Sequence, residues 1–156
     1  MAIQIIAVGQ KMPKWVDSAF TEYAKRLPRQ QSVTLSCIAT ASRKSGQSTA
    51  RIQQQEAEKI RQRIKPGSLT IALDEKGQQW STSEWADQYR QWQQRYPVVN
   101  FVIGGPDGID PELLHQADQK IALGRMTMPH GLVRVVLIEQ LYRVWSVVEG
   151  HPYHRE

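Results

Sequence analysis

Cysteine, long apolar runs and secretory signals are scarce or missing in this chain of 156 residues. The single cysteine, Cys37, excludes a disulfide bond within the chain and is typical of a reducing compartment. No apolar run approaches the roughly 20 residues that a membrane-spanning helix requires. The opening MAIQIIAVGQ has neither the basic start nor the apolar length of a signal peptide. We therefore expect a cytoplasmic protein that has no membrane partner.

A nucleotide-binding glycine motif is also missing from the place where a Rossmann fold would have it. Residues 2–8 form an apolar run that predicts a buried strand, but Gly9-Gln10-Lys11-Met12-Pro13 follows it instead of a glycine-rich turn. Such a turn, Gly104-Gly105-Pro106-Asp107-Gly108, comes only after the fourth predicted strand. This order disfavours a Rossmann-type methyltransferase and predicts a ligand pocket that loops build late in the chain.

Predicted strands and helices alternate along the chain, whose hydrophobic content of 40% and charged content of 22% are ordinary for one globular domain, residues 1–156. The predicted strands are residues 2–8, 33–39, 69–74, 98–103 and 121–123, the third of them ending in a turn at Glu75-Lys76-Gly77. The predicted helices are residues 13–27, 51–64, 81–95 and 132–148, with a short one opened by Asp110-Pro111. This alternation predicts an α/β fold with a largely parallel sheet flanked by helices.

The last predicted helix is apolar on nearly every side. Glu139, Arg143 and Ser146 fall on one narrow polar stripe along it. A helix of this kind is poorly suited to the surface of a monomer, so we expect a homodimer with the helix at the interface. The stripe that carries Arg143 would then face a pocket.

Basic residues are concentrated in the first part of the chain. The formal net charge is +5 and the isoelectric point is near 9.5. The first 65 residues carry twelve basic and four acidic side chains, and the remaining 91 carry eight and eleven. The asymmetry favours a nucleic acid partner on the basic half, with Arg43 and Lys44 in a loop that contacts RNA. A solvated helix face would account equally well for the run from Lys59 to Lys65 taken alone.

Other chemistry-bearing residues carry weaker signals. His151 and His154 have the spacing of a metal pair, but the sequence nearby offers no third ligand, which disfavours a metal site. Cys37 lies between apolar neighbours and is expected to be a packed thiol. His130 is expected either to cap the last helix or to line the loop before it.

Three segments in the last third of the chain carry a specific resemblance. They read V-I-G-G-P-D-G, M-P-H-G-L-V-R-V-V-L-I-E-Q-L-Y-R and H-P-Y-H-R-E. Together with V-G-Q-K-M-P-K-W-V and F-T-E-Y-A-K-R-L-P near the start, they resemble the RlmH (YbeA-type) ribosomal RNA methyltransferases of the SPOUT superfamily from end to end. Asp107 stands where the family pattern has Glu, and Val144 where it has Ala.

The resemblance implies a fold, a cofactor and a reaction. The fold is an α/β sheet whose C-terminal part forms a deep trefoil knot, and the protein is a homodimer. The reaction is the methylation of N3 of a pseudouridine in helix 69 of 23S ribosomal RNA, on the assembled ribosome, with S-adenosyl-L-methionine as cofactor. Carried over by motif, the cofactor-binding residues are Leu73, Gly104, Gly105, Leu123, Gly124, Arg125, Met126, Thr127 and Met128.

The reaction requires the N3 proton to leave and the negative charge to be dispersed. Arg143 and Arg155 are suited to stabilise an anionic base or to bind phosphates. Tyr153 is suited to stack on the target ring and His154 to accept the proton. The alternatives are that the C-terminal residues are a frayed end, or that the protein is a non-catalytic dimer that binds RNA or the ribosome through its basic half.

Overall fold

The computed structural model describes residues 1–42 and 46–155 of the chain. Arg43 and Lys44, which the sequence assigns to RNA contact, lie outside the described residues. The described part contains one sheet of five parallel strands in the order β2-β1-β4-β3-β5. The strands are β1 (Ala2–Val8), β2 (Val33–Ile38), β3 (Leu69–Gln79), β4 (Val98–Ile103) and β5 (Gln119–Ala122). The predicted parallel α/β sheet is therefore confirmed.

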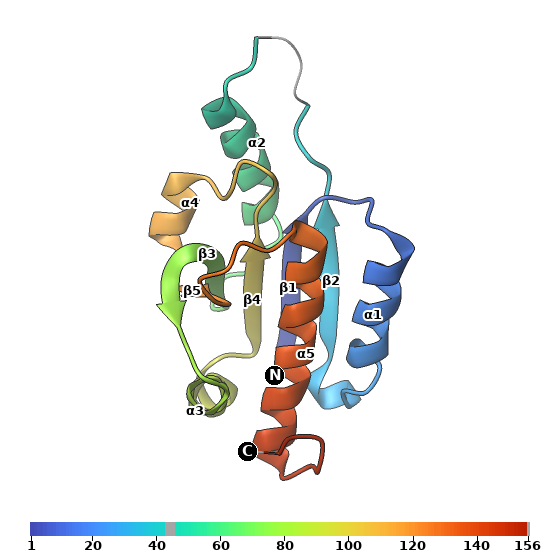
Figure 1. The fold of residues 1–156 in the computed structure, drawn as a ribbon. Helices are drawn as coiled ribbons and strands as arrows, with labels where there is room; N and C mark the ends of the chain where they lie inside the picture. Colours follow the sequence, from blue (N-terminus) through green and yellow to red (C-terminus); the bar gives the residue numbers. More distant parts are fainter. Residues whose placement is uncertain (43–45, 156) are drawn as a thin grey trace.

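Helices cover both faces of this sheet (Figure 1). On one face, α5 (His130–Glu149) packs between α1 (Lys14–Ala24) and α3 (Thr82–Arg95). On the other face, α2 (Thr49–Arg61) and α4 (Pro111–Gln116) pack against the strands. A short 3₁₀ helix, Arg29–Gln31, precedes β2. The result is a three-layer domain in which the last helix of the chain is the central helix of its layer.

The two covered faces explain why the central strands are apolar on both sides. In β1, Ile3 and Ile5 point into the core beneath α1, α3 and α5, whereas Ile6 and Val8 point into the core beneath α2 and α4. Side chains alternate between the faces of a strand, so a strand buried on both sides is apolar at most positions, with Gln4 in β1 and Asn100 in β4 as the exceptions.

Three helix termini follow the signals in the sequence. Ser81 and Glu84 form a complete capping box at the start of α3. Asp110 accepts a hydrogen bond from the backbone N–H of Leu113 and so caps α4. Gly150 ends α5 in the left-handed region, with φ of 72°. These local contacts depend on neighbouring residues only, which is why the sequence predicts them.

The predicted end of the third strand was wrong. Residues 75–77 do not form a turn, because β3 continues to Gln79 and its register against β5 shifts between Leu73 and Gln78. A Cβ on Gly77 would lie 2.6 Å from the backbone nitrogen of Ile121. Gly77 therefore permits the close approach of two strands at an irregularity, and not the reversal of the chain.

The apolar circumference of α5 is covered largely within the protomer. Leu137, Ile138 and Leu141 are almost completely buried by the sheet and the two neighbouring helices. The argument that a helix apolar on all sides requires a second subunit was therefore too strong. A smaller apolar strip lies outside the core cluster, comprising the half-buried residues Leu132, Val135 and Val136, which share one face at helical spacing.

Candidate active site

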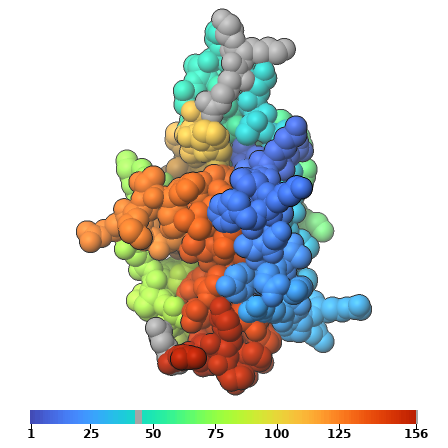
Figure 2. Space-filling view, turned by 45° about the vertical axis from the view of Figure 1, so that its right-hand side comes forward, coloured from blue at the N-terminus to red at the C-terminus, as the bar shows by residue number. Residues whose placement is uncertain are grey.

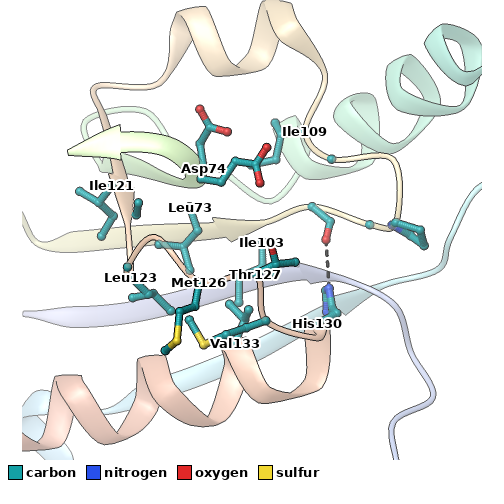
Figure 3. Close-up of a pocket in the computed structure, with 18 of the residues that line it drawn as sticks. Leu73, Asp74, Ile103, Ile109, Ile121, Leu123, Met126, Thr127, His130 and Val133 are labelled. Atoms are coloured by element: carbon teal, nitrogen blue, oxygen red, sulfur yellow. Dashed lines mark hydrogen bonds between the residues drawn. The ribbon is translucent and has the colours of Figure 1, made fainter. Parts of the chain in front are cut away.

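A cavity of about 500 Å³ opens where the carboxyl ends of β4 and β5 meet the irregular middle part of β3. Three parts of the chain line the cavity, namely residues 73–75 of β3 at its irregularity, the glycine turn after β4 and the loop of residues 123–128 after β5. Figure 3 shows Leu73, Ile103, Leu123 and Val133 converging between the strands and α5. The volume falls in the range of pockets that bind small molecules and cofactors.

Nearly all of the residues predicted to bind the cofactor line this cavity. They are Leu73, Gly104, Gly105, Leu123, Gly124, Met126, Thr127 and Met128. Arg125 is not among the lining residues and its side chain is exposed. Met126 is 82% exposed although it lines the cavity, and Figure 2 shows the orange segment after β5 standing out from the surface. The structure thus brings together segments that are about 50 residues apart in the sequence.

The glycine turn is a compact reversal closed by a hydrogen bond of 2.9 Å from the backbone N–H of Gly108 to the carbonyl of Gly105. A Cβ on Gly104 would lie 2.8 Å from the backbone of Gly108. A Cβ on Gly105 would lie 3.0 Å from Val8 Cγ1 and 3.2 Å from Glu56 Oε1. Both glycines therefore allow the turn itself to pack tightly. Gly108 and Gly124 line the cavity with open space where a Cβ would be, and of these two Gly108 has a positive φ of 80°.

Helix α2 supports the turn from behind. Gln53 Nε2 donates a hydrogen bond of 2.7 Å to the carbonyl of Asp107. Glu56, only 3% exposed, accepts a hydrogen bond of 3.1 Å from the backbone N–H of Ala41. From the sequence, Gln53 and Glu56 were expected only to be ordinary residues of a glutamine-rich helix. The position of Glu56 on the apolar side of this helix is the feature of the sequence that could have identified it.

His130 joins the glycine turn to the first turn of α5. Its Nδ1 lies 3.0 Å from the carbonyl oxygen of Gly104, the contact drawn as a dashed line in Figure 3. Burial lowers the pKa of His130, and the neighbouring guanidinium of Arg134 lowers it further. The capping position before α5 belongs to Pro129, without a side-chain hydrogen bond. Of the two expectations for His130, lining the loop pocket is confirmed.

The C-terminal residues fold back on α5 and form a second cluster. Tyr153 packs against Tyr142 with the rings tilted by 59° and their centroids 4.5 Å apart, and its hydroxyl donates a hydrogen bond of 3.0 Å to Glu139 Oε1. Arg143 donates to the same oxygen at 2.6 Å and lies 5.1 Å from the Tyr153 ring centroid. His154 Nδ1 lies 3.1 Å from Ser146 Oγ. These residues are therefore not a frayed end.

Glu139 organises this cluster, although the sequence placed it only on the polar stripe of the last helix. It holds both the guanidinium of Arg143 and the hydroxyl of Tyr153. Burial, and then the hydrogen bond to Glu139, raise the pKa of Tyr153 to about 12. The phenol is therefore protonated at neutral pH. Arg155 is exposed at the end of the cluster.

The cavity and the C-terminal cluster lie at opposite ends of α5. His130 begins the helix, whereas Arg143 and the folded tail lie near its end. A helix rises about 1.5 Å per residue, so these ends are about 20 Å apart. None of the four residues predicted to be catalytic lines the cavity. One protomer therefore does not bring the two predicted groups together.

The lining suits a cationic nucleoside-like ligand such as S-adenosyl-L-methionine. Apolar side chains offer a surface for a flat ring, and the glycine turn brings the backbone to the wall of the cavity. The carboxylate residues Asp74, Glu75 and Asp107 also line the cavity and would complement a positive charge. Among residues 1–42 and 46–155, no three His, Cys, Asp or Glu side chains gather in a way that would hold a metal ion. No helix in the same residues is long and apolar enough to cross a membrane.

A parallel sheet with helices on both faces and a cavity toward the carboxyl ends of its strands is the arrangement of α/β domains that bind ligands at that edge. The chain belongs to the SPOUT methyltransferase family, because the family model described as "Predicted SPOUT methyltransferase" matches residues 1–154. The C-terminal trefoil knot follows from membership of this family.

Relatives match the chain over almost its whole length. It is 46% identical, over 155 residues and 99% of both chains, to the protein named ribosomal RNA large subunit methyltransferase H from Burkholderia vietnamiensis (strain G4 / LMG 22486). The protein of the same name from Burkholderia multivorans (strain ATCC 17616 / 249) has the same identity and coverage.

Proposed function

We propose that the protein is a cytoplasmic ribosomal RNA methyltransferase that acts as a single SPOUT domain, residues 1–156, and uses S-adenosyl-L-methionine. The observation that carries this proposal is the cavity between the middle of β3 and the carboxyl ends of β4 and β5, which gathers nearly all of the predicted cofactor residues. The relatives' names supply the substrate class, since both are ribosomal RNA large subunit methyltransferases.

The finer proposal is the target, N3 of a pseudouridine in helix 69 of 23S ribosomal RNA on the assembled ribosome. It is supported by the sequence resemblance, which extends to the closing residues 151–156. The cofactor supplies an electrophilic methyl group when bound. The residues that would hold it are Leu73, Gly104, Gly105 and the loop of residues 123–128, with Arg125 directed to solvent.

The residues of the C-terminal cluster are proposed to act on the target base. Arg143 and Arg155 would disperse negative charge as the N3 proton leaves, and His154 would accept that proton. Tyr153 would stack on the base and, because its hydroxyl is protonated, contribute no negative charge. Glu139 would hold Arg143 and Tyr153 in place.

Because the cavity and the C-terminal cluster lie far apart in one protomer, the proposed active site is composite, with the cavity of one protomer and the C-terminal cluster of its partner in a homodimer. If two α5 helices pack antiparallel about a two-fold axis, the C-terminal cluster of one protomer approaches the cavity of the other. The strip of Leu132, Val135 and Val136, which lies outside the core cluster, is proposed as the centre of this contact. Trp15, 57% exposed on the neighbouring α1, would extend it.

The alternative is a dimer that binds RNA or the ribosome without catalysis. The basic first half supports RNA binding in either case. Isothermal titration of the purified protein with S-adenosyl-L-methionine separates the two functions. Micromolar or tighter binding supports the enzyme, and no heat of binding in a folded dimer supports the alternative.

A further inference from the structure

A buried arginine lies beside the cavity without belonging to its lining. Arg134 is only 1% exposed. No carboxylate forms an ion pair with it in the described part of the chain. Burying a guanidinium is costly, and an apolar side chain of similar size would fill the same space with less desolvation. The hydrogen bonds of Arg134 therefore require an explanation beyond packing.

Each bond of Arg134 ends near the carboxyl edge of the sheet. Nη2 donates a hydrogen bond of 2.6 Å to the carbonyl of Gly9, directly after β1. Nη1 lies 3.5 Å from the sulfur of Cys37 in β2. Nε donates to Nε2 of His130 at 3.0 Å. One side chain of α5 thus connects the ends of two strands to the histidine that contacts the glycine turn.

These contacts determine the tautomer of His130. The guanidinium of Arg134 can only donate, so Nε2 of His130 must accept. The imidazole proton is then on Nδ1, which donates to the carbonyl of Gly104. A protonated His130 has no lone pair for Arg134 and would place two cations in contact. The neutral ring, which Arg134 holds through Nε2, therefore holds the Gly104 peptide through Nδ1.

We propose that Arg134 and His130 are positioning residues that hold the Gly104 peptide in the orientation that the cofactor pocket requires. The inference rests on the proposed function, because it assumes that S-adenosyl-L-methionine binds in the cavity lined by Gly104 and His130. Neither residue carries out chemistry on the substrate. Arg134 acts through His130, and His130 acts through one backbone carbonyl.

The test compares two substitutions that each keep half of the imidazole's role. In His130→Asn the side-chain amide can occupy the position of Nδ1 and still donate to Gly104. In His130→Gln the amide reaches the position of Nε2, where it can accept from Arg134 but leaves the Gly104 carbonyl without its donor. Arg134→Met removes the whole anchor, and Gln140→Met, which breaks a hydrogen bond from the same helix to Thr82, is the matched control.

The dissociation constant for S-adenosyl-L-methionine is measured by isothermal titration, together with unfolding in urea for each variant. We expect His130→Gln and Arg134→Met to bind about tenfold more weakly than the wild type, as for the loss of one buried hydrogen bond. His130→Asn keeps the donor to Gly104 but loses the acceptor for Arg134, so it should lose clearly less affinity than His130→Gln. Gln140→Met should bind with wild-type affinity. If Arg134→Met does not fold, the pair of His130 variants decides.

Two results would overturn the inference. One is unchanged affinity in folded His130→Gln, and the other is an equal loss in His130→Asn and His130→Gln. A purely structural role would lower the urea midpoint of the variants without changing the affinity of the folded protein. The failure of the proposed function is distinguishable, because the wild type itself would then give no heat with S-adenosyl-L-methionine.

Discussion

The composite active site predicts that two inactive variants restore activity when they form a mixed dimer. One variant, Gly124→Trp, fills the cavity, since a Cβ at Gly124 meets no protein atom and the residue lines the cavity. The other variant carries His154→Ala and Arg155→Ala and leaves the cavity intact. Within one protomer the two changes lie near opposite ends of α5, about 20 Å apart along the helix axis.

The expected magnitude follows from random pairing. When equal amounts of the two variants are unfolded and refolded together, about half of the dimers are mixed if pairing is random. A mixed dimer then has one intact pair, formed by the cavity of one protomer and the C-terminal residues of its partner. The mixture should therefore recover about a quarter of the wild-type activity, while either variant alone stays inactive.

The assay is transfer of a labelled methyl group to ribosomes, with each variant first checked for folding and for cofactor binding. Gly124→Trp should lose cofactor affinity, and the double variant should keep it. Deletion of residues 153–156 is a poorer choice, because Tyr153 packs on Tyr142 and its loss would cost about 1 to 2 kcal/mol. An inactive mixture of folded, mixed dimers would refute the composite site, since a site within one protomer leaves no intact pair.

Three further predictions concern the dimer, RNA capture and pH. Val136→Asp should yield a folded monomer, because it places a charge in the proposed interface at a cost of several kcal/mol, whereas Leu141→Asp should unfold the protomer. Sedimentation at micromolar concentration and circular dichroism separate these outcomes. A wild-type protein that is already monomeric at that concentration would contradict the interface. Ribosome binding should weaken steeply with salt. Replacing both Arg43 and Lys44 should reduce the slope of the logarithm of the binding constant against the logarithm of the salt concentration by about two, if each side chain contacts one phosphate. An unchanged slope would show that neither residue contacts a phosphate. The pKa of His130 is lowered in the folded protein, so below the usual histidine pKa of 6.5 the unfolded chain binds more protons than the folded one. The free energy of unfolding should therefore fall as the pH drops below 6.5, and it should fall less in His130→Asn than in the wild type. Identical pH profiles of unfolding for the two proteins would count against a neutral His130.

The features that the sequence predicts well are those with local causes. The bounds of β1 and β4 follow from short apolar runs, and the ends of α3 and α5 follow from a capping box and a glycine in the left-handed region. The continuation of β3 past Gly77 has no local signal. A glycine among charged residues favours a turn, and only the approach of β5 to that point determines otherwise.

The site shows the same division. Motifs identify most cavity residues, because each follows the end of a predicted strand and parallel strands end at one edge of the sheet. The role of Arg134 was missed, since it lies in an otherwise apolar run and its partners Gly9 and His130 are distant or ambiguous in sequence. The distance between the cavity and Arg143 follows from the rise of the predicted helix, but the position of His154 beside Ser146 was unpredictable, because it depends on how the tail folds back along α5.

The central claim is methylation of one pseudouridine in ribosomal RNA by this chain. The most direct measurement incubates the purified protein and S-adenosyl-L-methionine with ribosomes that lack the modification, and identifies the methylated nucleoside by mass spectrometry of the digested RNA. Free 23S ribosomal RNA is the parallel substrate. We predict N3-methylpseudouridine at a single position in helix 69, formed on assembled ribosomes and far more slowly on free RNA. Methylation of a different nucleotide, or none by a folded protein that binds the cofactor, would contradict the account.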